Sequence, residues 1–427
     1  MSVLAGRLTD TIATTLDRLR GLGDVLIGVA IWLFAAFIAT TALLNEVAGA
    51  AVLVLPVPIL LAAATGFVLR YGDTLRGRGD ELVVTGMWAN ILVFGTWAIL
   101  TETDAFAVGV VTGSILALGA IGLTLIYGIL KFAHFAHGDS MMLAGYIAFF
   151  ALTGTVVGER TDTQALPWSL SDLPGATDRL PWPDGLGGGD FSFGYGLLIA
   201  LVATAAIMAL AFVGLDRLVY RPLRRRRSGI VIFAIASLGI AIAMRSLMLI
   251  FWASSPRFYA PGIRPTTDLP FDVRIVTDQI FIFFAAIVLA ALVYVLLFRT
   301  KLGKAMRAMS DNPDLAQVSG ISTDRIVVWT WLIAGGLVAV AGVLLALQAQ
   351  LKPELGFLLL LPLFAAVILG GIGSPQGAFA GGMIVGISQE VAVTLGFISP
   401  GYKFSVAFVI LILILLLRPR GLFGAKT

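Results

Sequence analysis

Both histidines of the chain lie in one short polar stretch, KFAHFAHGDSMM, over residues 131–142. His134 and His137 are three residues apart, a spacing that places two metal ligands on one helix face. A zinc site needs further ligands, but the chain has no cysteine and no other histidine, and Asp139 is the only nearby carboxylate. The alternative is a helix break in which Gly138 takes a positive φ and Asp139 caps the next helix. The composition favours this hinge, with no metal bound.

The segments around this stretch are apolar. The chain has 427 residues, of which 59% are hydrophobic and 13% charged, and its mean hydropathy is +0.97. A soluble protein of this length needs more polar surface, and apolar runs of about 20 residues match the thickness of a bilayer. The sequence therefore predicts an all-α polytopic transmembrane bundle. Its net charge of +4 mostly reports topology, and we expect no nucleic-acid partner.

We predict about twelve membrane spans. Their ranges are 24–44, 48–69, 82–100, 105–130, 139–157, 196–219, 229–252, 277–298, 327–349, 357–372, 376–396 and 403–418. The segment 357–372 is short enough to be a broken or re-entrant helix. With twelve spans, the basic loops 70–81, 220–228 and 299–325 and both termini fall on one side, which the positive-inside rule makes cytoplasmic. The four arginines at 224–227 fit a topology anchor or a contact with anionic membrane lipid.

The predicted spans form two parts. Residues 1–104 carry three spans of plain composition and are interpreted as an N-terminal extension. Residues 105–427 form the core. Within the core, Glu390 and Arg245 are ionisable residues inside predicted spans, where charge is costly and indicates function by default. The two side chains could pair with each other, or each could face a polar cavity.

The polar segment 301–325 reads KLGKAMRAMSDNPDLAQVSGISTDR. Asp311 or Asn312 can cap a short helix over 313–318 that begins at a proline and ends at Gly320. Such a rigid cytoplasmic knob suits a pump driven by a soluble motor, and it equally suits an ordinary loop helix. The run LGGIGSPQG at 369–377 lacks the lysine of a phosphate loop. It predicts close helix packing or a broken helix.

Several stretches, in this order, resemble one family. They are GLTLIYGILKFAHFAHGDSMMLAGYIA (122–148), RLVYRPLRRRR (217–227), GKAMRAMSDNPDLAQVSGISTDRI (303–326), LPLFAAVILGGIGSPQGAFAGG (361–382) and RPRGLFG (418–424). Over roughly 105–424 the chain is similar to the Liv-type permeases of branched-chain amino acid ABC importers, more to the first of the two paralogous permeases than to the second. Permeases for urea and short amides share the pattern.

The resemblance implies an assembly in the bacterial inner membrane. Its partners would be a second permease subunit, two cytoplasmic ATPases that bind ATP and Mg, and an external substrate-binding protein. This chain would bind no cofactor and catalyse no reaction. The residues that the resemblance assigns to ATPase coupling are Arg307, Ser310, Asp311, Asn312, Ala316 and Gly320. Those assigned to a substrate pathway or gate are His137, Gly138, Asp139, Gly128, Gly371, Gly373 and Glu390.

Other functions fit the sequence less well. An ion-driven secondary transporter would need an acidic relay inside the membrane, for which Glu390 alone is thin support. A membrane enzyme would need a cluster of nucleophile, base or metal ligands, and a channel would need a filter-like segment; neither is visible. The expected function is therefore ATP-driven import of leucine, isoleucine and valine, with urea or short amides as the alternative substrates.

Overall fold

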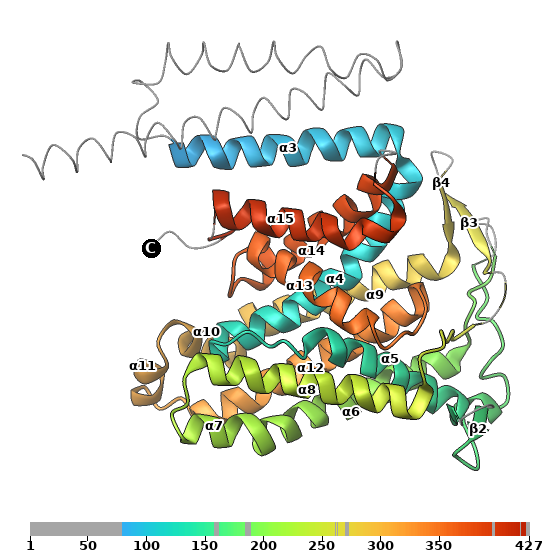
Figure 1. The fold of residues 1–427 in the computed structure, drawn as a ribbon, viewed down its shortest axis with the longest axis horizontal. Helices are drawn as coiled ribbons and strands as arrows, with labels where there is room; N and C mark the ends of the chain where they lie inside the picture. The colour runs from blue at the N-terminus through green and yellow to red at the C-terminus, as the bar shows by residue number, and fades with distance from the viewer. Residues whose placement is uncertain are drawn as a thin grey trace, which may run out of the picture. The chain divides into compact units, whose positions relative to one another are not determined.

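The computed structural model describes residues 79–157, 162–183, 189–260, 262, 264–269, 273–394, 398–418 and 420–423 (Figure 1). The predicted spans 24–44 and 48–69 lie outside these residues. The chain divides into two compact units, Met1–Thr103 and Asp104–Thr427. In the first, helix α3 (Gly79–Thr101) includes the predicted span 82–100. The span count of the first 104 residues stays a prediction.

Helices make up most of the described chain. Six of them are long and apolar enough to cross a membrane: α4 (Thr103–Leu130), the continuous helix Tyr195–Arg225, α8 (Ile230–Trp252), α9 (Thr277–Arg299), α12 (Thr323–Gln348) and α14 (Pro375–Thr394). The continuous helix consists of α6 (Tyr195–Leu215), a π-helical turn and α7 (Arg221–Arg225). A helix satisfies its own backbone groups, which hydrocarbon requires. The polytopic helical prediction is confirmed, whereas the number twelve remains a prediction.

Three of the predicted spans are shorter helices. The span 139–157 is α5 (His137–Thr153) followed by strand β1. The span 357–372 is α13 (Leu355–Gly370), with Pro362 inside the helix. The span 403–418 is α15 (Lys403–Leu417). A helix of 17 residues rises roughly 25 Å, less than the ~30 Å of a hydrocarbon core. These helices therefore depend on neighbouring protein.

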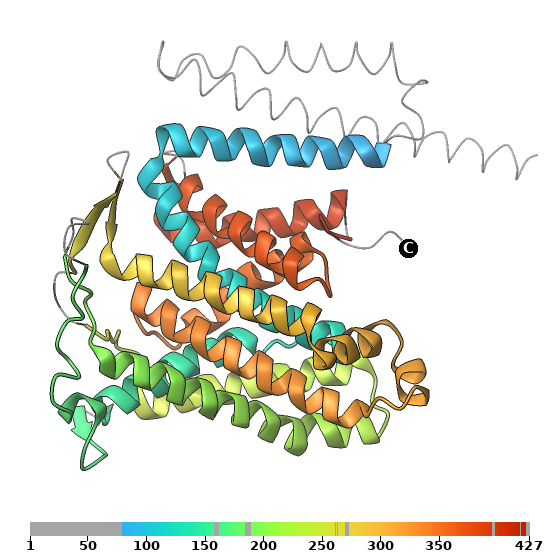
Figure 2. The ribbon, with the colours of Figure 1, turned by 180° about the vertical axis from the view of Figure 1, so that it is seen from behind.

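Two long helices are each followed by a six-residue break and a short helix. Helix α4 leads through 131–136 into α5, and α12 leads through 349–354 into α13. The C-terminal end of α4 and the start of α12 both adjoin the segment that contains α10 (Lys301–Asp311) and α11 (Pro313–Val318). The two helix–break–helix units therefore run in opposite directions (Figure 2).

Small residues bring the long helices together. A Cβ added to Gly382 of α14 would lie 2.6 Å from the backbone nitrogen of Ala117 in α4, and a Cβ on Gly386 would collide with Gly113. On the other side, a Cβ on Gly342 of α12 would collide with the carbonyl of Met141 in α5. Close backbone approach of this kind is the usual packing device of membrane helices. Gly113 of α4 and Gly386 of α14 thus allow these two helices to meet backbone to backbone.

The opposite end of the bundle carries two small antiparallel hairpins. Strands β1 (Thr155–Val157) and β2 (Asp162–Gln164) form one, with Thr155 opposite Gln164. Strands β3 (Thr266–Leu269) and β4 (Val273–Val276) form the other. The backbone N–H of Ser192 donates to Asp278 at 2.8 Å, which attaches the loop between β2 and α6 to α9.

Candidate functional site

The break after α4 differs from the predicted one. Helix α5 already begins at His137, and Gly138 and Asp139 lie in its first turn. Gly138 has no positive φ; the left-handed residue is Lys131, with φ 59°. Asp139 caps nothing, since the N-cap is Ala136 and no side chain bonds there. The predicted turn chemistry at these positions was wrong, because the break ends at residue 136 and HGD already belongs to the helix that follows.

Gly138 is required by close helix packing and not by a positive φ. A Cβ on Gly138 would collide with the carbonyl oxygen of Gly356, near the start of α13, and a Cβ on Gly356 would lie 2.7 Å from the Cα of Asp139. The first turns of α5 and α13 therefore meet backbone to backbone. Only glycine at both positions allows this contact, which joins the two helix–break–helix units at their centre.

The two histidines are buried and do not share a ligand. His137 Nε2 lies 2.8 Å from the carbonyl oxygen of Gly119, in the interior of α4. His134 lies in an aromatic cage whose ring centroids are 5.5–6.2 Å from its own, formed by Phe132, Phe212, Tyr220 and Trp331. Within the described residues, no group of three or more His, Cys, Asp or Glu could hold a metal ion.

The aromatic cage connects to an ion pair near the end of the continuous helix Tyr195–Arg225. Trp331 Nε1 donates to Asp216 Oδ1 at 2.7 Å. Both terminal nitrogens of Arg224 donate to the same carboxylate, at 2.7 and 2.9 Å. Bidentate pairs of this kind fix geometry as well as adding energy. Asp216 thus joins the end of α6 to α12 through Trp331, and Arg224 of the four-arginine run pairs with Asp216 along the same helix.

Asp139 pairs with Arg245, not with a helix terminus. Its carboxylate accepts from Nε of Arg245 at 3.1 Å and from Nη2 at 2.9 and 3.1 Å. The Asp139 side chain is 1% exposed and that of Arg245 is 26% exposed. The guanidinium also lies over the ring of Phe357, 5.0 Å from its centroid. Removing one partner of a buried pair costs about 3–5 kcal/mol, so this contact holds α8 to α5.

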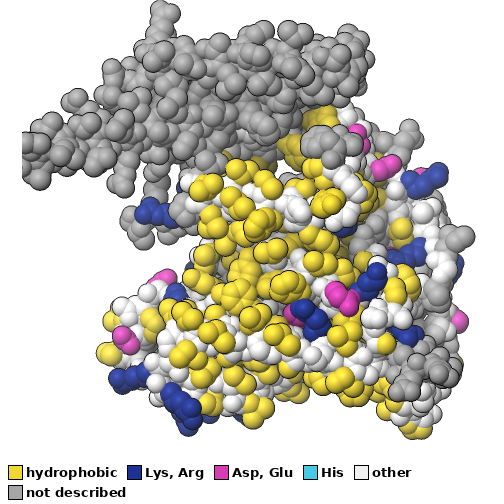
Figure 3. All heavy atoms as spheres, in the orientation of Figure 1, with side chains coloured by type: hydrophobic (Ala, Val, Ile, Leu, Met, Phe, Trp, Pro, Cys, Tyr) yellow, Lys and Arg dark blue, Asp and Glu magenta, His cyan; other side chains and the backbone are white. Residues whose placement is uncertain are grey.

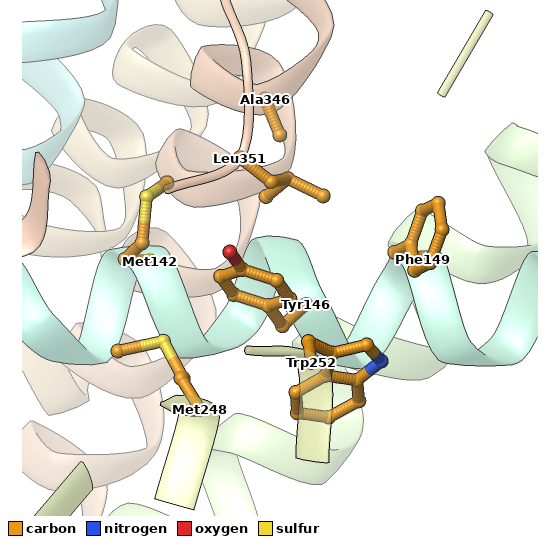
Figure 4. Packing of buried hydrophobic residues seen from close by; sticks show 7 residues of the cluster. All are labelled: Met142, Tyr146, Phe149, Met248, Trp252, Ala346 and Leu351. Carbon is orange, nitrogen blue, oxygen red and sulfur yellow. The ribbon is translucent and has the colours of Figure 1, made fainter. Parts of the chain in front are cut away.

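A hydrophobic cluster continues the same α5–α8 contact (Figure 4). Asp139, Met142 and Tyr146 follow one stripe of α5, and Arg245, Met248 and Trp252 follow the matching stripe of α8. Tyr146 and Trp252 stack with centroids 5.1 Å apart. Burial raises the pKa of the Tyr259 phenol in the adjoining loop well above its usual range. Its hydroxyl therefore stays protonated and donates to the Gly145 carbonyl at 2.8 Å.

The short helix of the 301–325 segment is confirmed. Helix α11 spans Pro313–Val318, and Asn312 Oδ1 accepts from the backbone N–H of Leu315 at 3.0 Å. Gly320 follows with φ 84°, the left-handed conformation typical after a helix end. Asn312, and not Asp311, is the cap. The sequence predicts this element well because its cap, proline and glycine signals are all local.

Replacing Asn312 by alanine should destabilise α11 by about 1 kcal/mol, the usual cost of an N-cap. The Leu315 amide would lose its acceptor at an exposed helix end. Hydrogen exchange of the amides of 314–318 in detergent would measure the loss, and Asn312→Asp should retain most of the protection. If Asn312→Ala and Asn312→Asp showed equal protection, Asn312 would not act as the cap.

The end of α10 meets the break after α4. Ser310 Oγ donates to the carbonyl of Gly128 at 3.0 Å, and Lys131 Nζ donates to the carbonyl of Ser310 at 2.8 Å. The turn between α13 and α14 joins them, because a Cβ on Gly128 would lie 3.5 Å from the Cα of Gly373. The structure thus brings together Ser310, Gly128 and Gly373, three residues that the sequence had placed in separate motifs.

Gly371 and Gly373 form the tight turn that reaches this junction. Their φ values are 99° and 85°, which other residues adopt only with strain. Gly373 N–H donates to Thr124 Oγ1 of α4 at 2.9 Å. The C-terminal stretch that contains Leu422 packs beside this turn, and the Leu422 N–H donates to the Leu369 carbonyl at 2.7 Å.

The remaining residues of the predicted coupling set differ in exposure. Arg307 is exposed and lies over Phe298, 4.8 Å from the ring centroid. Asp311 is exposed, whereas Ala316 is buried, so Ala316 shapes the segment and offers no contact surface. Sequence reasoning missed two exposed apolar residues of α11, Leu315 (63%) and Val318 (87%). Their three-residue spacing within a polar loop was the signal that could have found them.

Glu390 and Arg245 do not pair with each other. Glu390 Oε1 accepts from Lys403 Nζ at 3.1 Å and from Thr112 Oγ1 at 3.2 Å. These contacts join α14, α15 and α4. Glu390 therefore has a local cation as partner and needs no polar cavity.

Neutralising Glu390 should have a small effect. Its pair with Lys403 is partly exposed and is worth well under about 2 kcal/mol, so Glu390→Gln should retain transport within about threefold. The pH profile of transport should not change. A large loss with an altered pH profile would indicate a proton relay and support the ion-driven alternative.

Comparison with known proteins decides the family. The family of branched-chain amino acid transport system permease components matches residues 105–415. The chain belongs to this family. It is 31% identical over 323 residues to the high-affinity branched-chain amino acid transport system permease protein BraD of Pseudomonas aeruginosa, covering 74% of this chain and 94% of that protein. It is 30% identical to LivH of Escherichia coli K12, over 74% and 93% of the two chains.

A third relative comes from an archaeon. The probable branched-chain amino acid transport permease protein LivH of Methanocaldococcus jannaschii is 28% identical over 330 residues, 74% of this chain and 90% of that protein. No solved structure matches the chain. With the six apolar helices, family membership makes the chain a multi-pass membrane permease component.

Proposed function

We propose that the chain is the permease subunit of an ATP-driven importer in the bacterial inner membrane, and that its substrates are leucine, isoleucine and valine. The names of BraD and LivH support this substrate class. Its partners would be a second, paralogous permease, two ATPases and an external binding protein. ATP and Mg would bind to the ATPases, and this chain would hold no cofactor.

The proposed topology places the α10–α11 end in the cytoplasm. Basic residues of α7 and α10 gather at this end, including Arg224, Arg225, Lys301 and Lys304, as the positive-inside rule requires. Twelve spans would then put both termini in the cytoplasm. The two hairpins would face the external binding protein.

The junction at Ser310 is the observation that carries the mechanism. Helix α11 offers an exposed surface with two apolar residues, and the preceding α10 is bonded to the break after α4 through Ser310 and Lys131. Movement of the ATPases at α11 would therefore act directly on the break and on the α13–α14 turn. Such a link between a rigid cytoplasmic element and two helix breaks suits alternating access.

The test is uptake of labelled leucine and labelled urea in cells that produce this chain with the subunits encoded beside it. Each label is measured with the intact ATPase and with its phosphate-loop lysine replaced. We expect leucine uptake that disappears in the ATPase variant. Uptake of urea alone would select the amide-importer alternative, and uptake that persists without ATPase activity would favour an ion-driven transporter and contradict the coupling role of 301–325.

A further inference from the structure

Arg245 lies deep within an apolar helix. It is 15 residues after the start of α8 at Ile230 and seven before the end at Trp252. At ~1.5 Å per residue, these separations are roughly 22 and 10 Å. Most of α8 is not covered by the rest of the chain. An arginine at this depth faces lipid only at a high cost, so it indicates a polar pathway or a protein partner.

The guanidinium has one side without a partner. Asp139 occupies Nε and Nη2, and Phe357 covers one face. Nη1 makes no hydrogen bond with any residue that the structure describes, and it is not among the buried unpaired atoms. Nη1 therefore keeps some accessible surface, in line with the 26% exposure of the side chain. The ion pair with Asp139 accounts for Nε and Nη2 of Arg245 but leaves Nη1 without a partner among the described residues.

A carboxylate lies in the neighbouring break. Glu354 directly precedes α13 and is exposed. It precedes Gly356 by two residues, and a Cβ on Gly356 would lie 2.7 Å from the Cα of Asp139, the partner of Arg245. Neither Glu354 nor the nearby Lys352 forms an ion pair with the part of the chain that the structure describes. Figure 3 shows that a few charged side chains, in blue and magenta, interrupt the largely hydrophobic face of the molecule.

Next to Arg245, helix α13 presents exposed apolar side chains. Phe357 is 49% exposed and Leu361 is 41% exposed, one turn apart along α13. A ligand that fits must therefore combine a carboxylate, an ammonium group and an apolar body. Arginine is the residue best suited to a carboxylate, since its planar donors match the two oxygens.

We propose that Arg245 and Glu354 form a transient site for the passing amino acid inside the permease. Nη1 of Arg245 donates to the α-carboxylate, Glu354 accepts from the α-ammonium group, and the side chain contacts Phe357 and Leu361. Asp139 positions Arg245 and touches no substrate. The inference rests on the proposed function and adds a zwitterion site to it.

The experiment uses the complete importer in proteoliposomes, with leucine-loaded binding protein outside and ATP inside. Three quantities are measured: assembly by size exclusion, ATPase stimulation, and leucine moved per ATP hydrolysed. Arg245→Gln and Glu354→Gln should keep ATPase stimulation, while leucine moved per ATP falls about tenfold, the value of one charged hydrogen bond. Lys352→Gln, a charge removal in the same break, should behave as the unmodified importer.

The double variant Asp139→Arg with Arg245→Asp separates positioning from substrate contact. It keeps an ion pair, of opposite polarity, between α5 and α8, so the importer should assemble while leucine moved per ATP stays low. Normal assembly together with normal leucine transport would reduce the pair to a structural contact and overturn the proposal. So would unchanged transport in Arg245→Gln and Glu354→Gln, or an equal loss in Lys352→Gln.

Glu354→Gln keeps the proposal falsifiable if Arg245→Gln fails to assemble, because Glu354 forms no ion pair within the described residues. The proposed function fails separately. An unmodified importer that moves no leucine with ATP would contradict the function and not the site.

Discussion

Val318→Asp and Asp311→Lys are each expected to reduce ATP-driven uptake by at least about tenfold while membrane insertion is unchanged. Val318 is 87% exposed, so a charge there should alter the stability of the isolated chain by no more than about 0.5 kcal/mol. The same charge would be buried without a partner once α11 docks in an ATPase groove. Burying an unpaired charge costs several kcal/mol, enough to prevent assembly.

The measurement is uptake of labelled leucine, with the amount of inserted permease determined on immunoblots and the ATPase bound determined by co-purification. Asp178→Lys, a charge change in the loop at the opposite end, is the control and should be neutral. Normal uptake by both α11-segment variants would contradict the coupling assignment. Loss of insertion would show that the segment acts in folding.

Gly138→Val should remove the folded core altogether. A Cβ at this position collides with the carbonyl of Gly356, and both atoms belong to helix backbones that cannot rotate away. Overpacking a core costs about 1–3 kcal/mol when side chains can adjust, and a backbone collision costs more. We expect little protein in the membrane and no uptake.

Gly239→Val on α8 is the matched control, since a Cβ at Gly239 would meet nothing within 4 Å. It should insert and transport normally. Thermal unfolding in detergent, followed by size exclusion, measures both variants. A stable Gly138→Val protein would show that the first turns of α5 and α13 can separate, and the two breaks would then not be joined through this contact.

Helix bounds and caps that depend on local sequence signals were predicted correctly. Contacts between residues far apart in the sequence were not predicted. The bounds of α8 and α9 and the Asn312 cap depend on residues within a few positions of each other, so a single chain reveals them. Asp139 appeared to be a cap because caps are local. Its actual partner is 106 positions away in the sequence, a distance over which residue type alone cannot select one arginine.

The candidate site was predictable in its parts and not in its assembly. Gly128, Ser310 and Gly373 were all marked as candidates, but only the folded chain shows that they meet. The left-handed Lys131 gave no signal, because lysine has no preference for positive φ. Arg245 was visible as an ionisable residue in an apolar run, whereas the position of its Nη1 group required the geometry of its neighbours.

The two oppositely directed helix–break–helix units have a consequence for how the chain changes state. Whatever bend the break at 131–136 adopts to expose one side of the membrane, the break at 349–354 can adopt in reverse to expose the other. Under the proposed function, the structure with the opposite opening would be obtained by exchanging the conformations of the two units. A single backbone design, used twice, would supply both the inner and the outer gate.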